Sequence, residues 1–202
     1  MTREVLKHPS VERVTVVDID KDVIAVAKEY FADSTAAAFE NESVDIRCMD
    51  AAVYVREHKD EFDVIIVDSA DPVGPAQALF SQEFYGNLRG ALRPGGIVCA
   101  QGESQWLHLD LIHETLCMAK KFFEHVEYAS MYVPTYPSGQ IGMIVVSNAQ
   151  FVRALLNRRL TTWMATLHRL HFPGVGLAFW LFVYSYWQHI GSVSRSAGCQ
   201  RR

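Results

Sequence analysis

The sequence predicts an α/β protein built around a doubly wound, mainly parallel sheet. Two observations predict this fold. Short apolar runs alternate with helix-like stretches over residues 10–147, in the order expected of strand–helix–strand units. Acidic residues follow three of these runs, and in open α/β sheets ligands bind outside the carboxyl ends of the strands.

The first part of the pattern predicts two strands, each followed by a helix. Residues 13–18 (RVTVVD) predict a buried strand, and residues 21–30 predict a helix that Asp20 can cap. Residues 44–48 predict the second strand, and residues 51–57 a short helix after it. Two strands joined through a helix in this way are expected to run parallel.

The strongest strand pattern comes next, at residues 63–68 (DVIIVD). Consecutive β-formers of this kind are typical of a strand covered on both faces. A helix is predicted over residues 81–92, ended by Arg-Pro-Gly-Gly at 93–96. A strand over 97–100 and an amphipathic helix over 108–123 follow, the latter because its apolar residues recur every three or four positions.

Both ends of this pattern depart from a regular parallel sheet. Residues 125–133 and 140–147 predict two strands around the turn 136–139, which makes them an antiparallel pair. The chain opens with a predicted helix over residues 2–8, and no glycine precedes Gly74. Folds of this nucleotide-binding type begin with a strand and a glycine-rich turn. The sequence therefore predicts a sheet that lacks its first strand and that loop.

The absent strand has a predicted consequence for stability. Its usual place is between the strands at 13–18 and 63–68, so both would keep unpaired backbone groups. We expect the isolated chain to be poorly folded unless these strands pair directly or residues 177–184 insert between them. In either case we expect weak binding of an adenosyl group.

Charge and composition predict a boundary close to residue 148. The net charge is −4, yet residues 151–202 carry seven arginines and no acidic residue. We expect a catalytic domain over 1–147 and an unrelated, poorly ordered basic and aromatic tail over 148–202. Residues 172–187 of that tail are uncharged, but a helix that spans a membrane needs about 20 apolar residues. We therefore expect a cytoplasmic protein without a signal peptide, and membrane anchoring through these residues is a minor alternative. Nucleic-acid binding is not expected, since the arginines are not clustered with aromatic residues.

Carboxylates at the predicted strand ends are the first candidate site residues. Asp18 suits hydrogen bonds from ribose hydroxyls, or is a plain strand-end carboxylate. Asp50 suits an adenine amino group or caps the following helix. Asp68 and Asp71 leave a third strand in a stiff loop (68–76, DSADPVGPA); such a pair could bind a cationic amine, hold Mg²⁺ or simply form a turn.

Three motifs resemble the spermidine synthase family of aminopropyltransferases. They are DSADPVGPA at 68–76, QGESQWLH at 101–108 and PTYPSGQIG at 134–142, within a similarity that runs from about residue 2 to residue 147. The resemblance implies a Rossmann-like, methyltransferase-type sheet. It also implies transfer of an aminopropyl group from decarboxylated S-adenosylmethionine to putrescine, giving spermidine and methylthioadenosine. Family members are usually homo-oligomers with a further N-terminal region.

By the same resemblance, Asp68 matches the catalytic base and Asp71 the residue that binds the diamine. Gln101 and Tyr136 match residues that line the putrescine site. The donor-site positions are matched by the following residues: Asp18, Ile19, Asp50, Ala51, Ser69 and Pro75. The sulfonium of the donor already makes its propyl carbon electrophilic, so no metal and no cofactor are expected.

Two departures from the family pattern are mild. Asp18, which stands where Glu is usual, is one methylene shorter, and Ala51, which replaces a glycine, still allows close approach. With the first strand absent, an inactive fragment or a catalytically dead partner of an intact synthase is the main alternative. A putrescine N-methyltransferase, which would use S-adenosylmethionine itself, is the second; an assay with both donors separates it from the synthase.

Overall fold

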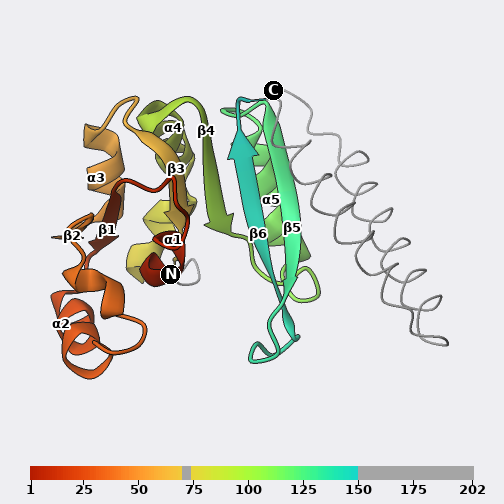
Figure 1. Cartoon of the computed structure of the whole chain (residues 1–202). Helices are drawn as coiled ribbons and strands as arrows, with labels where there is room; N and C mark the ends of the chain where they lie inside the picture. Colours follow the sequence, from red (N-terminus) through yellow and green to blue (C-terminus); the bar gives the residue numbers. More distant parts are fainter. Residues whose placement is uncertain (70–73, 150–202) are drawn as a thin grey trace, which may run out of the picture. The chain divides into compact units, whose positions relative to one another are not determined.

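Two separate sheets organise the chain (Figure 1), instead of the single sheet predicted from the sequence. The computed structural model describes residues 1–69 and 74–149. It divides into two units, Met1–Asp63 with Ser69–Arg93, and Val64–Asp68 with the chain from Pro94 onward. Residues 150–202 of the predicted tail, including 172–187, lie outside the described part.

The first unit contains a two-stranded parallel sheet, β1 (Val14–Asp18) and β2 (Val44–Cys48). Its helices and 3-10 turns are α1 (Thr2–Val5), α2 (Lys21–Tyr30), η1 (Ala37–Glu40), α3 (Ala51–Glu57), η2 (Gly74–Phe80) and α4 (Gln82–Ala91). Helix α3 packs against α4, and the core of this unit includes Val55, Phe84, Tyr85, Leu88 and Ala91.

Local capping explains why three of these helices begin where the sequence predicts. The Asp20 carboxylate accepts hydrogen bonds from the backbone N–H groups of Asp22 and Val23, at 2.8 and 3.3 Å. Asp50 accepts one from Ala52 at 2.7 Å. Ser81 Oγ accepts one from Phe84 at 3.1 Å. Each bond satisfies a backbone donor that the first turn of a helix leaves unpaired.

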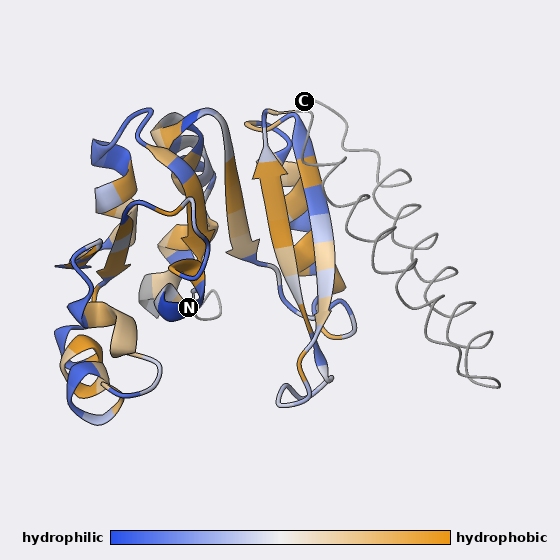
Figure 2. Cartoon of the chain, viewed as in Figure 1, coloured by the Kyte–Doolittle hydropathy of each residue, from blue (hydrophilic) through white to orange (hydrophobic). Residues whose placement is uncertain are grey.

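A four-stranded sheet in the order β3-β4-β6-β5 carries the second unit. Its strands are β3 (Phe62–Val67), whose first two residues belong to the first unit, β4 (Leu92–Gln101), β5 (His125–Tyr132) and β6 (Gln140–Ser147). Strand β6 is antiparallel to both of its neighbours. Figure 2 shows how strongly hydrophobic β4 and β6 are, and Val98, Ile144 and Val146 are almost completely buried.

Helix α5 (Leu109–Ala119) also belongs to this unit and contacts β5. Ile112 and Ala119 of the helix are buried, as is Phe123 just after it. The predicted antiparallel pair around the turn 136–139 is therefore confirmed, as are the strand at 44–48 and the helices at 21–30 and 51–57.

Several predictions about the elements were wrong. The opening helix ends at Val5 and α5 ends at Ala119, where the chain tightens so that Phe122 and Phe123 both donate to the Ala119 carbonyl. Residues 93–96 do not end a helix as a turn but extend β4. The sheet is mixed because β6 inserts between β4 and β5.

Strand β3 is not covered on both faces, contrary to the prediction. It lies at the edge of its sheet, and Val64 and Ile66 are 57% and 39% exposed. Strands β1 and β3 belong to different sheets, so direct pairing between them does not occur in the structure. The alternative, insertion of residues 177–184, concerns residues outside the described part.

Candidate active site

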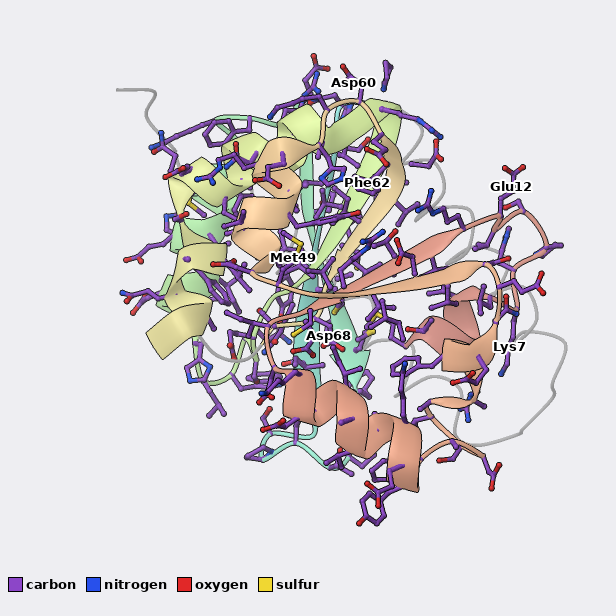
Figure 3. The ribbon with its side chains drawn as sticks, turned by 90° about the vertical axis from the view of Figure 1, so that its left-hand side faces the viewer. Lys7, Glu12, Met49, Asp60, Phe62 and Asp68 are labelled. Atoms are coloured by element: carbon purple, nitrogen blue, oxygen red, sulfur yellow. The ribbon has the colours of Figure 1, made fainter. Side chains whose placement is uncertain are left out.

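One edge of the four-stranded sheet gathers polar residues from two neighbouring strands. Asp68 directly follows β3 and is labelled in Figure 3, while Gln101 is the last residue of β4. The two strands are neighbours connected through α4, and their arrows point the same way in Figure 1. Their carboxyl ends therefore share an edge, which is where ligands bind in open α/β sheets. Asp68 is exposed and Gln101 half-buried.

The hairpin between β5 and β6 brings Tyr136 to the same edge. Strand β6 runs antiparallel to β4 with Gln101 opposite Met143, so the turn before Gln140 lies beyond the end of β4. The turn is closed by hydrogen bonds from the Tyr136 N–H to the Val133 carbonyl (3.0 Å) and from the Gly139 N–H to the Tyr136 carbonyl (2.8 Å). The Tyr136 side chain itself remains 46% exposed. An amphipathic ring in this position can contact a ligand at the edge.

Sequence reasoning gave no role to Glu103, which the structure places beside Gln101. Its carboxylate is only 10% exposed. Gln101 Nε2 donates to Oε1 at 3.4 Å, and His108 Nδ1 lies 3.1 Å from Oε2. Leaving a buried carboxylate without partners would cost several kcal/mol, so these contacts account for its presence. An acidic residue two positions after a strand end, inside a motif already singled out, was the signal available in the sequence.

A buried polar network ties the loop after β4 to the hairpin. Ser104 Oγ donates to Gln140 Oε1 at 3.1 Å and lies 2.8 Å from Ser138 Oγ. Gln140 Nε2 donates to the hydroxyl groups of Tyr128 and Ser130, at 3.1 and 3.0 Å. Burial raises the pKa of Tyr128 above its ordinary value, so this phenol stays a neutral donor and acceptor. The network holds both sides of the edge in a fixed arrangement.

The first unit presents its own pair of strand ends. Asp18 and Cys48 are partners at the ends of parallel β1 and β2, and the Met49 N–H donates to the Asp18 carbonyl at 2.9 Å. The Asp18 carboxylate accepts from the Asp20 N–H at 2.9 Å. Next to it, Ile19 is 62% exposed. These residues are brought to one edge of the small sheet, as the sequence predicts.

Asp50 and Ala51 begin α3, directly after the second of these strands. Asp50 is the cap of α3, one of the two roles left open by the sequence. One hydrogen bond does not exhaust a carboxylate, which has about four lone-pair sites, so capping is compatible with a contact to an adenine amino group. Ser69 is half-buried in the same unit. The donor-binding role of all these residues stays a prediction.

Two predicted site residues are not placed by the structure. Asp71 lies outside the described residues, and so does the side chain of Pro75. In the described ranges, no group of three or more His, Cys, Asp or Glu side chains could hold a metal ion. No helix within those ranges is long and apolar enough to cross a membrane.

The fold is that of a Rossmann-like α/β protein with polar residues at its strand ends, and comparison with known proteins identifies its family. The family model described as "Spermine/spermidine synthase domain" matches residues 1–155. The chain therefore belongs to the spermine/spermidine synthase family.

Individual relatives agree with this assignment. Spermidine synthase of Dictyostelium discoideum is 48% identical over 145 residues, which cover 72% of this chain and 51% of the relative. Spermidine synthase of Schizosaccharomyces pombe is 41% identical over 161 residues, covering 80% and 53%. The chain thus spans about half the length of the curated relatives it matches.

Solved structures show the same fold. A spermidine synthase crystallised with the transition-state analogue AdoDATO superposes with a TM-score of 0.69 at 34% identity, covering 73% of this chain and 50% of that one. The spermidine synthase of Thermotoga maritima gives a TM-score of 0.67, also at 34% identity, covering 73% and 49%. The predicted Rossmann-like, methyltransferase-type fold is confirmed.

Proposed function

We propose that this protein transfers an aminopropyl group from decarboxylated S-adenosylmethionine to putrescine, giving spermidine and methylthioadenosine. The observation that carries the proposal is the edge of the four-stranded sheet. Asp68, Gln101 and Tyr136 gather there, in a chain that matches the family over residues 1–155. Membership of the family indicates the class of reaction. The residues at this edge of the sheet include the groups proposed to accept a proton and to bind the amine.

The chemistry assigns a distinct task to each carboxylate. Putrescine is protonated at neutral pH, and an ammonium has no lone pair with which to attack carbon. Asp68 takes a proton from the attacking nitrogen, and Asp71 binds and orients the diamine. The nitrogen lone pair then forms a bond to the propyl carbon while the bond from that carbon to sulfur breaks. The electron pair of the broken bond neutralises the sulfonium, and methylthioadenosine leaves.

Positioning supplies most of the remaining rate. Alignment of nitrogen, carbon and sulfur converts a reaction between two molecules into one within a complex, worth about 7–11 kcal/mol in favourable cases. Asp18, Ile19, Asp50, Ala51, Ser69 and Pro75 form the proposed adenosyl site. Gln101 and Tyr136 line the proposed diamine site.

An assay with two donors tests the proposal. The 202-residue chain is incubated with putrescine and either decarboxylated S-adenosylmethionine or S-adenosylmethionine, and products are quantified by mass spectrometry. We expect spermidine and methylthioadenosine in equal amounts from the first donor and no product from the second. N-methylputrescine from the second donor would instead identify a methyltransferase, and no product from either would identify a catalytically inactive family member.

A further inference from the structure

The loop between β4 and α5 contains a contact between a histidine and an enclosed carboxylate that the proposed mechanism does not use. His108 Nδ1 lies 3.1 Å from Glu103 Oε2, and the side chains are 48% and 10% exposed. The imidazole is thus open to solvent on one side, whereas the carboxylate that it contacts is enclosed. Gln101, proposed to line the diamine site, donates to the other carboxylate oxygen.

The backbone on the Glu103 side of this contact is locked. Glu103 has a φ of +56°, a left-handed conformation that is uncommon for a residue with a side chain. Its carbonyl accepts from the Gly142 N–H at 2.7 Å and from the Tyr128 hydroxyl at 2.8 Å. The Gly102 N–H donates in turn to the Gly142 carbonyl at 2.8 Å. Strained backbone held from several sides in this way is concentrated at functional sites.

The His108 side of the contact is also fixed. His108 is the N-cap residue of α5; its N–H donates to the Ser104 carbonyl at 2.8 Å, and its carbonyl accepts from the Ile112 N–H at 3.0 Å. With both backbones held, the contacts with Gln101 and His108 restrict the rotamer of the Glu103 side chain. Gln101 fixes one oxygen and His108 the other.

We propose that His108 is a positioning residue for diamine binding. It holds the Glu103 carboxylate beside Gln101, so that a fixed negative charge faces the cationic amine that is not attacked. The inference rests on the proposed function for the identity of the ligand. Because the charge attracts the diamine equally before and during the reaction, losing its orientation raises KM for putrescine and leaves kcat unchanged.

Three substitutions of His108 distinguish an effect on the orientation of the Glu103 carboxylate from an effect on folding. His108→Ala removes the imidazole, His108→Asn keeps an N–H donor near the position of Nδ1, and His108→Gln places its donor farther out. His113→Ala, an exposed histidine of the same helix, is the matched control. Each variant is first checked for the wild-type thermal transition.

We expect His108→Ala and His108→Gln to raise KM for putrescine about tenfold, equivalent to about 1.4 kcal/mol, with kcat within about twofold of wild type. His108→Asn is expected to restore KM to within about threefold, and His113→Ala to leave it unchanged. If His108→Ala fails to fold, the comparison of Asn with Gln still decides the question. Equal KM values for those two variants, or a loss confined to kcat, would overturn the inference.

Calorimetric titration with putrescine distinguishes this inference from the proposed function. If wild type forms no spermidine but binds putrescine, and the variants follow the expected order of affinity, the inference stands and the transferase proposal fails. If wild type forms spermidine while His108→Ala binds putrescine as tightly as His113→Ala, the positioning role is wrong. If putrescine does not bind the wild-type chain, the inference is also refuted.

Discussion

Gly142 has a packing role that a single substitution can test. A Cβ at this position would overlap the ring of Tyr128 on the neighbouring strand, and that ring is held by its hydroxyl bond to the Glu103 carbonyl. We predict that Gly142→Ala lowers the free energy of unfolding by about 1–3 kcal/mol, the usual cost of overpacking. Urea denaturation measures this change.

Gly90→Ala is the matched control for that substitution. The added Cβ there would meet only the end of the flexible Lys59 side chain, and Gly90 lies inside α4. Alanine is favoured over glycine inside a helix by up to about 1 kcal/mol. We therefore expect Gly90→Ala to be neutral or stabilising. Equal destabilisation by the two substitutions would contradict the packing argument.

Tyr85 predicts how stability depends on alkaline pH. It is 3% exposed, and burial raises its pKa from the ordinary value of 10.0 to about 12. The unfolded chain therefore ionises first, so the stabilisation is complete below pH 10.0 and is lost as the pH rises through about 12. The free energy of unfolding of the Tyr85→Phe variant should therefore fall by roughly 2–3 kcal/mol less than that of wild type as the pH rises through this range. Denaturation at a series of pH values measures this difference. If the free energy of unfolding of the Phe variant falls as steeply at alkaline pH as that of wild type, Tyr85 is not the cause of the fall.

At the scale of elements, helix caps and pairing between strands that follow one another in the sequence could be predicted, whereas the extension of β4 through residues 93–96 could not. Asp20, Asp50 and Ser81 are short-range caps, and the helices that follow them were predicted almost to the residue. Residues 93–96 carry turn-forming glycines, yet they belong to β4. The Arg93 guanidinium pairs with Asp63 at 2.7 Å, and Ser147 Oγ donates to the Gly96 carbonyl at 2.8 Å. Such long-range partners override local propensity and have no signature in a single sequence.

The two sheets should differ in local stability. Strands β1 and β2 pair only with each other in the described structure, whereas β4 and β6 each have a neighbour on both sides. Two-stranded sheets are marginal without further packing, and such regions open more readily than core strands. We predict that β1 amides exchange with deuterium at least about tenfold faster than β6 amides. Equal protection in a mass-spectrometric exchange experiment would show that something else supports β1.

At the scale of the whole molecule, the sequence sufficed for the family. It also predicted that Asp68 and Gln101 lie at strand ends and Tyr136 in a hairpin turn, because such elements follow from periodicity and turn residues. The roles of these residues in binding and catalysis stay predictions. Glu103 was missed because its burial depends on a positive φ and on bonds to Gly142 and Tyr128, none of which periodicity reveals. The predicted division at residue 148 stays a prediction.

The proposed transfer of an aminopropyl group is tested most directly by comparing wild type with Asp68→Asn. Asparagine keeps the shape of the exposed Asp68 side chain but cannot take the proton from the attacking nitrogen. Spermidine formation is measured by mass spectrometry at saturating putrescine and decarboxylated S-adenosylmethionine, with methylthioadenosine binding as the check on folding. We predict that wild type forms spermidine at the high donor concentration that a weak adenosyl site requires. Asp68→Asn should lower kcat by about 10²–10⁴-fold while binding methylthioadenosine as weakly as wild type does. Near-normal turnover by Asp68→Asn, or no spermidine from wild type, would contradict the account.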